Sequence, residues 1–259
     1  MASEISPKAE ISPKAKIGDN CKIFPFVYIE DDVVIGDNCI IFPFVSICDG
    51  SRIGNNNKIH QGSVIAALPQ DFNFRGAKSY VEIGDNNVIR ENVVINRGTQ
   101  KDGVTKIGNH NYLLEGTHIS HDTVVGTNCV FGYGTKIAGD CEIHDGVIFS
   151  SSVIENAKTR VGRGAMIQAG TTFSKDVPPF IICTKKAEYG GVNFTMARAN
   201  GTDEKVLKHI ANAYRLVFHG KSSLFDDIIQ IEEQVPDSLE IRSILEFLRT
   251  TKLGIITKL

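Results

Sequence analysis

The stretch that decides the fold is Ile17-Gly18-Asp19-Asn20-Cys21-Lys22-Ile23-Phe24-Pro25-Phe26-Val27-Tyr28-Ile29. An aliphatic residue returns every six positions, and a small or short residue stands four places after it. The same register extends from Ile5 to Ile65, resumes from Ile83 to Ile95, and runs again from Ile107 to Phe173, with Glu155 in place of one aliphatic residue. A six-residue period is typical of a parallel β-helix, in which each coil buries its aliphatic face against the next. The pattern therefore predicts a mainly β fold of hexapeptide repeats.

Two interruptions replace whole hexads without changing the register. Residues 66–82 contain Pro69-Gln70-Asp71-Phe72 and lack the repeat. A long loop on a rigid scaffold is often functional, and a tolerated insertion is the alternative. Residues 100–106 indicate a short polar turn. The prolines of Asp176-Val177-Pro178-Pro179-Phe180 end the repeat, because proline cannot donate a ladder hydrogen bond.

The last quarter of the chain changes to a helical period. We expect Thr202 to be the N-cap of a first helix, with Asp203 and Glu204 in its first turn and Gly220 at its end. Apolar residues over 224–231 and 239–248 predict two further helices, which Pro236 separates. The expected organisation is a β-helix over residues 1–180, a connecting segment over 181–200 and an α-helical domain over 201–259.

The composition argues against several classes of function. The formal net charge is −2 and the pI is about 6.4, so a nucleic-acid partner has no support. No apolar run reaches the roughly 18 residues of a transmembrane segment, and no basic and apolar leader opens the chain, so we expect a cytoplasmic protein. Four cysteines at inward repeat positions are expected to be core residues rather than metal ligands or disulfide partners: Cys21, Cys39, Cys129 and Cys141.

The segment His118-Ile119-Ser120-His121-Asp122 places two histidines and a carboxylate within five residues. His121 is the third residue of its hexad, so it lies at a turn and points outward. An imidazole is the usual general base near neutral pH, and the adjacent carboxylate of Asp122 is suited to orient it. One alternative is surface decoration. Another is a zinc site, which requires a third ligand, for example from His60, His110 or His144.

Several motifs outside the hexads occur in order along the whole chain. They are Pro69-Gln70-Asp71-Phe72, Ile89-Arg90-Glu91-Asn92-Val93, Arg97-Gly98-Thr99, His118-Ile119-Ser120-His121-Asp122, Asp176-Val177-Pro178-Pro179, Gly191-Val192-Asn193 and Asn212-Ala213-Tyr214-Arg215. Together with the hexads, this set resembles the UDP-N-acetylglucosamine O-acyltransferase family of lipid A synthesis.

The resemblance implies a left-handed parallel β-helix followed by a C-terminal helical domain, assembled as a homotrimer with active sites between subunits. The implied reaction moves a 3-hydroxyacyl chain from acyl carrier protein to the 3-hydroxyl of UDP-N-acetylglucosamine. It implies no cofactor and no metal of the enzyme's own, since phosphopantetheine arrives on the carrier protein.

The resemblance also assigns roles to individual residues. His121 matches the general base beside Asp122, and Gly139 matches the backbone N–H donor to the oxyanion. The positions that match substrate-binding residues are Asp71 and His118 at the sugar, Ala169 at the acyl-length position, Asn193 and Arg198 towards the nucleotide, and Asn73, Asp140 and Asn156 where the family usually has other side chains.

These departures bear on the acceptor. Asn73 replaces a usual lysine, histidines are usual at Asn96, Asp140 and Asn156, glutamine is usual at Ala157, and paired arginines are usual at Ala199 and Asn200. Lys185, Lys186 and Arg198 are the expected substitutes for the lost phosphate contacts. Two further hypotheses therefore stand beside the acyltransferase of lipid A synthesis. One is an enzyme for a different sugar nucleotide, such as a 3-amino sugar, and the other is a paralog that binds without turnover.

Overall fold

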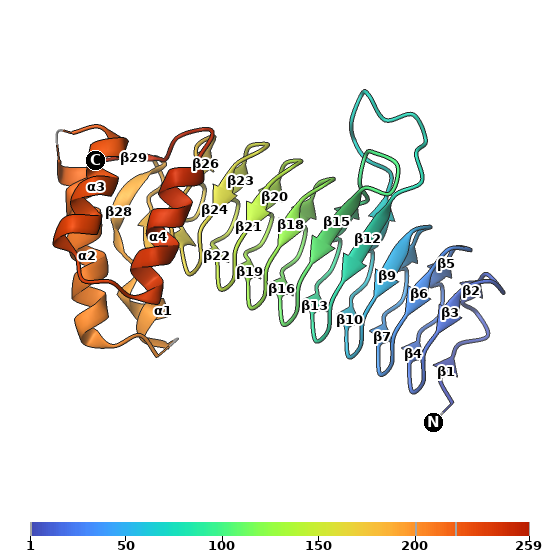
Figure 1. Cartoon of the computed structure of the whole chain (residues 1–259). Helices are drawn as coiled ribbons and strands as arrows, with labels where there is room; N and C mark the ends of the chain where they lie inside the picture. The colour runs from blue at the N-terminus through green and yellow to red at the C-terminus, as the bar shows by residue number, and fades with distance from the viewer. Residues whose placement is uncertain (1, 200, 221, 259) are drawn as a thin grey trace.

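The structure, a computed structural model, describes residues 2–199, 201–220 and 222–258. The predicted left-handed parallel β-helix with a C-terminal helical domain is the observed architecture (Figure 1). Each hexad forms a short strand and a turn, and three hexads complete one coil, so within the repeat from β1 to β26 each strand pairs with the strand three further along the chain. The described strands form three sheets of 12, 9 and 8 strands, here called sheets A, B and C.

The strands follow the hexads closely. Sheet A contains β1 (Glu4–Ile5), β4 (Lys22–Ile23), β7 (Ile40–Ile41), β10 (Lys58–Ile59), β13 (Val88–Ile89), β16 (Tyr112–Leu113), β19 (Val130–Phe131), β22 (Ile148–Phe149), β25 (Met166–Ile167), β27 (Ile181–Cys183), β28 (Glu188–Val192) and β29 (Thr257–Lys258). Sheet B contains β2 (Glu10–Ile11), β5 (Tyr28–Ile29), β8 (Ser46–Ile47), β11 (Val64–Ala67), β14 (Val94–Asn96), β17 (His118–Ile119), β20 (Lys136–Ile137), β23 (Ile154–Glu155) and β26 (Thr172–Phe173). Sheet C contains β3 (Lys16–Ile17), β6 (Val34–Ile35), β9 (Ser51–Ile53), β12 (Tyr80–Ile83), β15 (Val104–Ile107), β18 (Val124–Val125), β21 (Glu142–Ile143) and β24 (Arg160–Val161).

The aliphatic ladder fills the interior of the coils. Ile41, Ile59 and Ile89 stack in register in sheet A and are fully buried. The inward cysteines of the repeat are buried and unbridged, as predicted, and their burial raises the pKa of the Cys39 thiol to about 11 and that of Cys129 to about 12. A thiol with a raised pKa is a poor nucleophile and a poor metal ligand at neutral pH. These cysteines are therefore part of the core.

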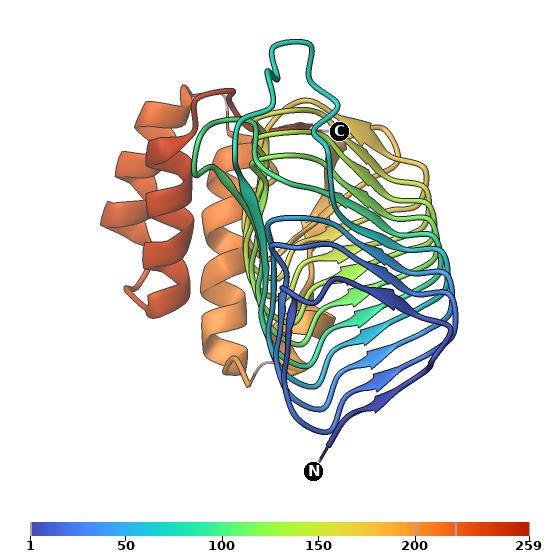
Figure 2. The same cartoon turned by 90° about the vertical axis from the view of Figure 1, so that its right-hand side faces the viewer.

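Both interruptions of the repeat leave the stack at one corner, the B–C corner, where the chain passes from sheet B to sheet C. Residues 68–79 connect β11 to β12, and residues 97–103 connect β14 to β15. The longer loop projects beyond the outline of the coils (Figures 1 and 2). The B–C corner therefore carries both loops that replace hexads of the β-helix.

Glu155 does not break its coil. It keeps the strand register, paired with Ile137 on one side and Phe173 on the other, and its side chain is fully buried. Thr159 Oγ1 lies 2.9 Å from Glu155 Oε1, whereas Glu155 Oε2 has no hydrogen-bond partner among the described residues. Burial is the main cause that raises the pKa of Glu155 well above its usual value, so the side chain is a neutral carboxylic acid at neutral pH.

We expect Glu155→Leu to stabilise the protein by about 1–3 kcal/mol at neutral pH, because it restores the aliphatic ladder and removes an unsatisfied buried oxygen. The native carboxyl holds a proton that the unfolded chain releases above about pH 4.5, so the stability of the unmodified protein falls as pH rises through and beyond that value. Denaturation at pH 4.5 and pH 8 should show the larger gain for the variant at pH 8. A gain that does not change with pH would contradict this explanation.

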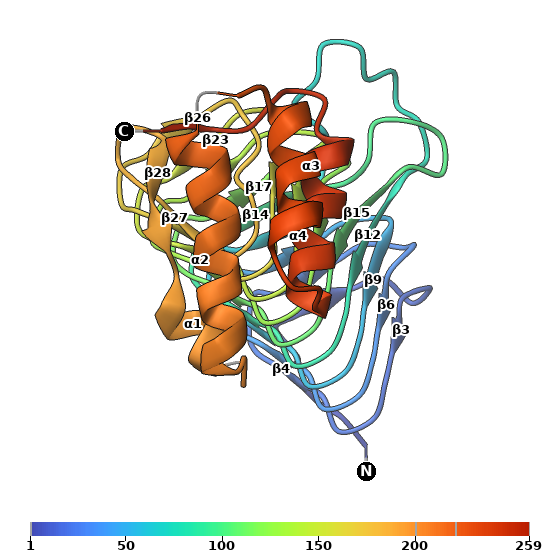
Figure 3. The ribbon, with the colours of Figure 1, turned by 60° about the vertical axis from the view of Figure 1, so that its left-hand side comes forward.

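The helical domain stacks on the C-terminal end of the β-helix (Figure 1). It contains α1 (Phe194–Ala199), α2 (Glu204–His219), α3 (Leu224–Gln234) and α4 (Leu239–Thr250), with α2 and α4 seen together in Figure 3. Tyr214 on α2 is fully buried and donates a hydrogen bond of 2.6 Å to the carbonyl of Pro179, which joins the domain to the end of the repeat. None of the described helices has the length and apolar character needed to cross a membrane.

Two details of this region differ from the sequence-based expectation. The N-cap of α2 is Asp203 rather than Thr202, because the Asp203 carboxylate accepts from the backbone N–H of Lys205, while Thr202 N–H donates back to Ala197. Residues 181–200 are also more than a connection. β27 continues sheet A by pairing with β25 beyond the expected boundary at residue 180, β28 pairs with β27, and α1 follows.

Candidate active site

His121 lies in the turn between β17 and β18 at the B–C corner, with a side chain that is 12% exposed. Its Nδ1 lies 3.0 Å from Asp122 Oδ2. The Asp122 carboxylate also accepts from the backbone N–H of Thr99 and, at 2.7 Å, from the Thr99 hydroxyl. A carboxylate is only an acceptor, so the imidazole donates from Nδ1 and keeps the lone pair of Nε2 for another proton. This geometry fixes the ring of His121 and leaves Nε2 able to accept a proton.

The local backbone explains why Asp122 is in this place. Its φ of 57° lies in the left-handed region, which aspartate tolerates better than most residues. Its N–H donates to the hydroxyl of Thr105, 2.8 Å away. Thr99 thus holds the carboxylate of Asp122, and Thr105 holds its backbone, beside His121.

Gly139 occupies the equivalent turn of the next coil, between β20 and β21, and lies against the imidazole of His121. A Cβ atom at this position would be 2.6 Å from His121 Nε2 and 2.9 Å from Nδ1, distances that side chains do not adopt. The requirement for glycine here is therefore space for the ring. The Gly139 N–H makes no hydrogen bond within the described residues, so it is available as a donor beside the base.

The loop of residues 68–79 brings Asp71 to the same corner. Asp71 Oδ2 lies 3.9 Å from His121 Nε2, and Asp71 Oδ1 accepts from the backbone N–H of Asn73 at 2.6 Å. Two atoms at this separation leave room for one hydroxyl oxygen about 2.8 Å from each, a normal hydrogen-bond distance. Both atoms are acceptors, so a hydroxyl group in this space would donate its single proton to one of them and only lie beside the other. The side chain of Asn73 itself is exposed.

His118 precedes His121 on strand β17, and its ring is partly buried. Its Nε2 lies 2.6 Å from Asn96 Oδ1. Burial, followed by the nearby charges of Lys136 and His121, lowers the pKa of His118 below its usual 6.5, so the ring is neutral at neutral pH.

The remaining predicted site residues are distributed more widely. Asp140 and Asn156 are exposed at the B–C corner, on the two coils that follow His121. Ala169 is exposed at a different corner, between β25 of sheet A and β26 of sheet B. A single chain therefore does not bring the acyl-length position to His121.

The two residues expected at the nucleotide are also remote from His121 in the fold. Asn193 is buried, donates to the carbonyl of Gly164 at 3.1 Å and accepts from the first turn of α1, so in one chain its side chain has a structural role. Arg198 on α1 is exposed and forms an ion pair of 2.5 Å with Glu204. Ala199 is exposed as well, and Asn200 lies outside the described residues.

The three histidines considered as third zinc ligands lie elsewhere. His60 stacks on Phe42 and faces Glu91, while His110 and His144 lie in turns between sheets C and A. The described part of the chain holds no group of three or more side chains suited to bind a metal ion. None of these three histidines is therefore a third ligand beside His118 and His121 within the described part of one chain.

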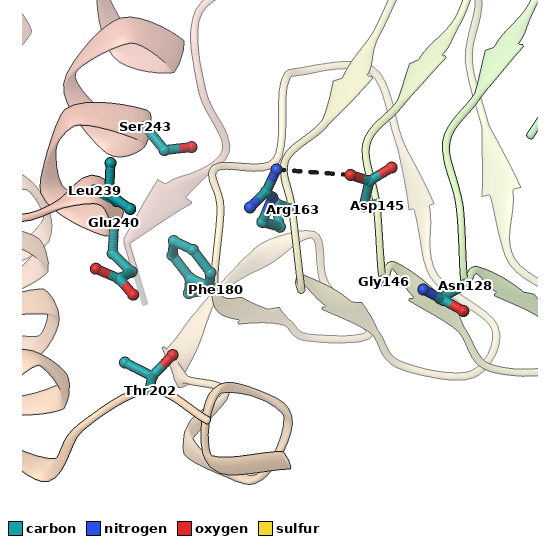
Figure 4. Close-up of a pocket in the computed structure, with 9 residues that line it drawn as sticks. All are labelled: Asn128, Asp145, Gly146, Arg163, Phe180, Thr202, Leu239, Glu240 and Ser243. Carbon is teal, nitrogen blue, oxygen red and sulfur yellow. Dashed lines mark ion pairs between the residues drawn. The ribbon is translucent and has the colours of Figure 1, made fainter. Parts of the chain in front are cut away.

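A cavity of about 270 Å³ lies elsewhere, between the β-helix and α4 (Figure 4). Arg163 and Asp145 face each other across part of it, 3.6 Å apart, beside Phe180, Leu239 and Glu240. None of the predicted site residues lines this cavity. It is separate from the cluster around His121.

The structure adds three residues that sequence reasoning did not single out as site residues. Thr99 and Thr105 bind Asp122, and Asn96 binds His118. The available signal was that Thr99 ends the quoted Arg97-Gly98-Thr99 motif and that Asn96, where the family usually has histidine, directly precedes it. Their partners lie 17 to 23 residues away in sequence, and only the stacking of coils reveals them.

The hexapeptide repeats place the chain in the class of bacterial hexapeptide transferases. The family model described as "Bacterial transferase hexapeptide (six repeats)" matches residues 14–41, 34–67 and 105–139. The family model described as "Udp N-acetylglucosamine O-acyltransferase; Domain 2" matches residues 176–256. The chain belongs to the acyl-[acyl-carrier-protein]–UDP-N-acetylglucosamine O-acyltransferase family. It is 39% identical to the protein of that name from Sulfurihydrogenibium over 254 residues, which covers 97% of this chain and 94% of that relative.

Other relatives belong to the same family. A protein of the same name from Xylella fastidiosa is 39% identical over 76% of both chains. The crystal structure of a UDP-N-acetylglucosamine acyltransferase from Bacteroides fragilis is 47% identical, with a TM-score of 0.96 over 97% of this chain and 99% of that one. The enzyme from Francisella novicida is 32% identical, with a TM-score of 0.95 over 98% of this chain and 94% of that one. The similarity includes the helical domain as well as the repeats.

Proposed function

We propose that the protein transfers a 3-hydroxyacyl chain from acyl carrier protein to the 3-hydroxyl of UDP-N-acetylglucosamine, the first step of lipid A synthesis. The observation that carries the proposal is the His121 imidazole, held by Asp122 at 3.0 Å and packed against Gly139. Membership of the family supplies the substrates, and this geometry supplies the chemistry.

In the proposed reaction, His121 Nε2 removes the proton of the sugar 3-hydroxyl as its oxygen attacks the thioester carbon. The carbonyl oxygen becomes an oxyanion, which accepts from the free N–H of Gly139. Collapse of the tetrahedral intermediate forms the ester and breaks the C–S bond, and the imidazolium returns its proton to the departing phosphopantetheine sulfur. Asp122 stabilises the imidazolium while it exists. No cofactor of the enzyme takes part.

The acceptor is proposed to bind along the B–C corner. Asp71 and His118 contact the sugar, while Asp140 and Asn156 face it from the following coils in place of the family's histidines. Asn73 is close in sequence to Asp71 but lacks the charge of the lysine that is usual there. We assign the phosphate contacts to Arg198, Lys185 and Lys186, which supply positive charge where the paired arginines are absent.

A second copy of the chain is needed to complete this site. Ala169, proposed at the end of the acyl chain, lies at the A–B corner, and Asn193 and Arg198 lie in the C-terminal region. The family resemblance implies a homotrimer, and we adopt that assembly for a cytoplasmic enzyme that meets acyl carrier protein. Lys205, Lys208 and Arg215 on α2 are the basic side chains that we propose for the acidic carrier protein.

The choice of acceptor is tested by competition. Equal concentrations of UDP-N-acetylglucosamine and its 3-amino analogue are offered with a panel of 3-hydroxyacyl carrier proteins, and the products are separated by mass. We expect the O-acyl product to predominate for at least one chain length. Exclusive formation of the N-acyl product would replace this function with that of the amino-sugar enzyme, and binding without any product would indicate the non-catalytic paralog.

Asp122→Asn is expected to lower kcat by roughly 10²-fold with little change in KM, because the imidazolium loses its stabilising charge. Asp145→Asn is the matched control, since Asp145 also accepts a backbone N–H at a β-helix corner, from Thr127 at 2.8 Å. Steady-state kinetics of both variants should show the loss only at Asp122. Equal rates for the two variants would remove Asp122 from the mechanism.

A further inference from the structure

The base of the loop that carries Asp71 is built around a β-bulge. The register of β11 and β14 shifts between Ile65 and Ala67, and Ala66 has a φ of 59°, in the left-handed region that alanine rarely adopts. Bulges are common beside active sites because they redirect the chain. Here the bulge directs the carbonyls of Ala67 and Leu68 towards Asn96 on the next coil.

Asn96 connects this loop to His118. Only 1% of Asn96 is exposed. Its Nδ2 donates to the carbonyl of Leu68 at 2.7 Å and lies 3.5 Å from that of Ala67, while its Oδ1 lies 2.6 Å from His118 Nε2. A buried amide with partners on both sides holds both of them in place.

The two partners determine the orientation of the amide and the tautomer of His118. Carbonyl oxygens only accept hydrogen bonds, so the NH2 group of Asn96 must face Leu68 and its oxygen must face His118. His118 Nε2 therefore carries the proton, and the neutral ring keeps its lone pair on Nδ1. Nδ1 of His118 has no hydrogen-bond partner among the described residues. It is not one of the fully buried unpartnered atoms either, so it is accessible from outside the protein. It is thus free to accept from a ligand.

We propose that Asn96 is a positioning residue, which ties the Asp71 loop to His118 and makes His118 Nδ1 an acceptor for a hydroxyl or amide N–H of the substrate. The proposal rests on the proposed acyl transfer for its substrate. Asn96 then links two sugar contacts, Asp71 and His118, that approach the ligand from different segments of the chain. It does this at a position where the family usually has histidine.

We call Asn96 with its hydrogen bonds to Leu68 and His118 the Asn96 clamp. Two substitutions distinguish its hydrogen bond to Leu68 from its hydrogen bond to His118. Asn96→Ala removes both hydrogen bonds, whereas Asn96→Asp keeps an acceptor for His118 and loses the donor to Leu68. With either change, we expect the loop of residues 68–79 to exchange its amide hydrogens faster and KM for the sugar nucleotide to rise roughly tenfold, as for the loss of one such hydrogen bond, with kcat less affected.

The proton on His118 gives a readout that is independent of activity. In protein labelled with ¹⁵N in its seven histidines, we expect a slowly exchanging proton on His118 Nε2, assigned by its absence in His118→Gln. The signal should remain in Asn96→Asp and disappear in Asn96→Ala. Asn111→Ala is the matched control, because Asn111 is another fully buried asparagine that links neighbouring coils, and the variant should keep both the signal and the slow loop exchange.

A proton on His118 Nδ1, a signal that persists in Asn96→Ala, or loop exchange that is unchanged in both Asn96 variants would overturn the proposal. These spectra do not depend on the reaction. A protein that fails to acylate UDP-N-acetylglucosamine would therefore contradict the proposed function. The His118 proton and the amide exchange of the loop would still test whether Asn96 holds both partners.

Discussion

Gly139→Ala should fold and yet lose most of its activity, with a fall in kcat of roughly 10²-fold or more, comparable with removal of a general base. The added methyl group would lie 2.6 Å from His121 Nε2, so the imidazole must leave its position beside Asp122. Gly139 does not have a positive φ, so alanine causes no backbone strain there. The whole effect then comes from the collision with the ring.

A double-mutant cycle isolates that collision. In the protein as it stands, we expect Gly139→Ala to lower the free energy of unfolding by about 1–3 kcal/mol, the usual result of overpacking. In His121→Ala the ring is absent, so the same glycine substitution should cost little stability and no further activity. Additive effects of the two substitutions would show that Gly139 and His121 act separately.

His121→Ala should reduce kcat by about 10²- to 10⁴-fold while sugar-nucleotide binding is retained, because proton removal from the acceptor hydroxyl then falls to water. His121→Gln tests the same point with a polar side chain that cannot act as a base at neutral pH. His144→Ala serves as the control, since His144 also lies at a β-helix corner beside a carboxylate, that of Glu142 at 3.0 Å. Steady-state rates with saturating carrier protein give the comparison. Turnover of either His121 variant at the unmodified rate would remove His121 from the catalytic step.

The repeat made the β-helix predictable because each coil repeats one local rule. An inward aliphatic residue every six positions defines the strand, the core and the outward corner at once, and His121 was placed correctly from its position in the hexad. Even Glu155 keeps this register, since the neighbouring coils impose the strand on it. The hexad pattern predicts nothing beyond its last repeat, so β27 and β28 were not predicted and are known only from the structure.

The site was less predictable because its contacts join residues that are far apart in sequence. Asp122 binds Thr99, which is 23 residues away in sequence, and Asn96 binds Leu68, which is 28 residues away. The second contact depends on a β-bulge that no local sequence pattern predicts. Asn193 shows the opposite case. A motif suggested a ligand contact, yet packing against Gly164 and α1 occupies its side chain in the single chain. The sequence therefore anticipated the contact between His121 and Asp122, whereas the catalytic and binding roles of the motif residues stay predictions.

Transfer to UDP-N-acetylglucosamine is the central claim, and it is proposed for a chain in which His121 and Asp122 are present while several binding side chains usual in the family are replaced. The most direct measurement is a single-turnover reaction of purified protein with labelled 3-hydroxyacyl carrier protein and UDP-N-acetylglucosamine, followed by mass analysis of the sugar nucleotide. We predict label in an ester at the sugar 3-oxygen, released carrier-protein thiol in equal amount, and almost none of either with His121→Ala. Label that stays on the carrier protein at every chain length, or equal ester formation by the His121→Ala protein, would contradict this prediction.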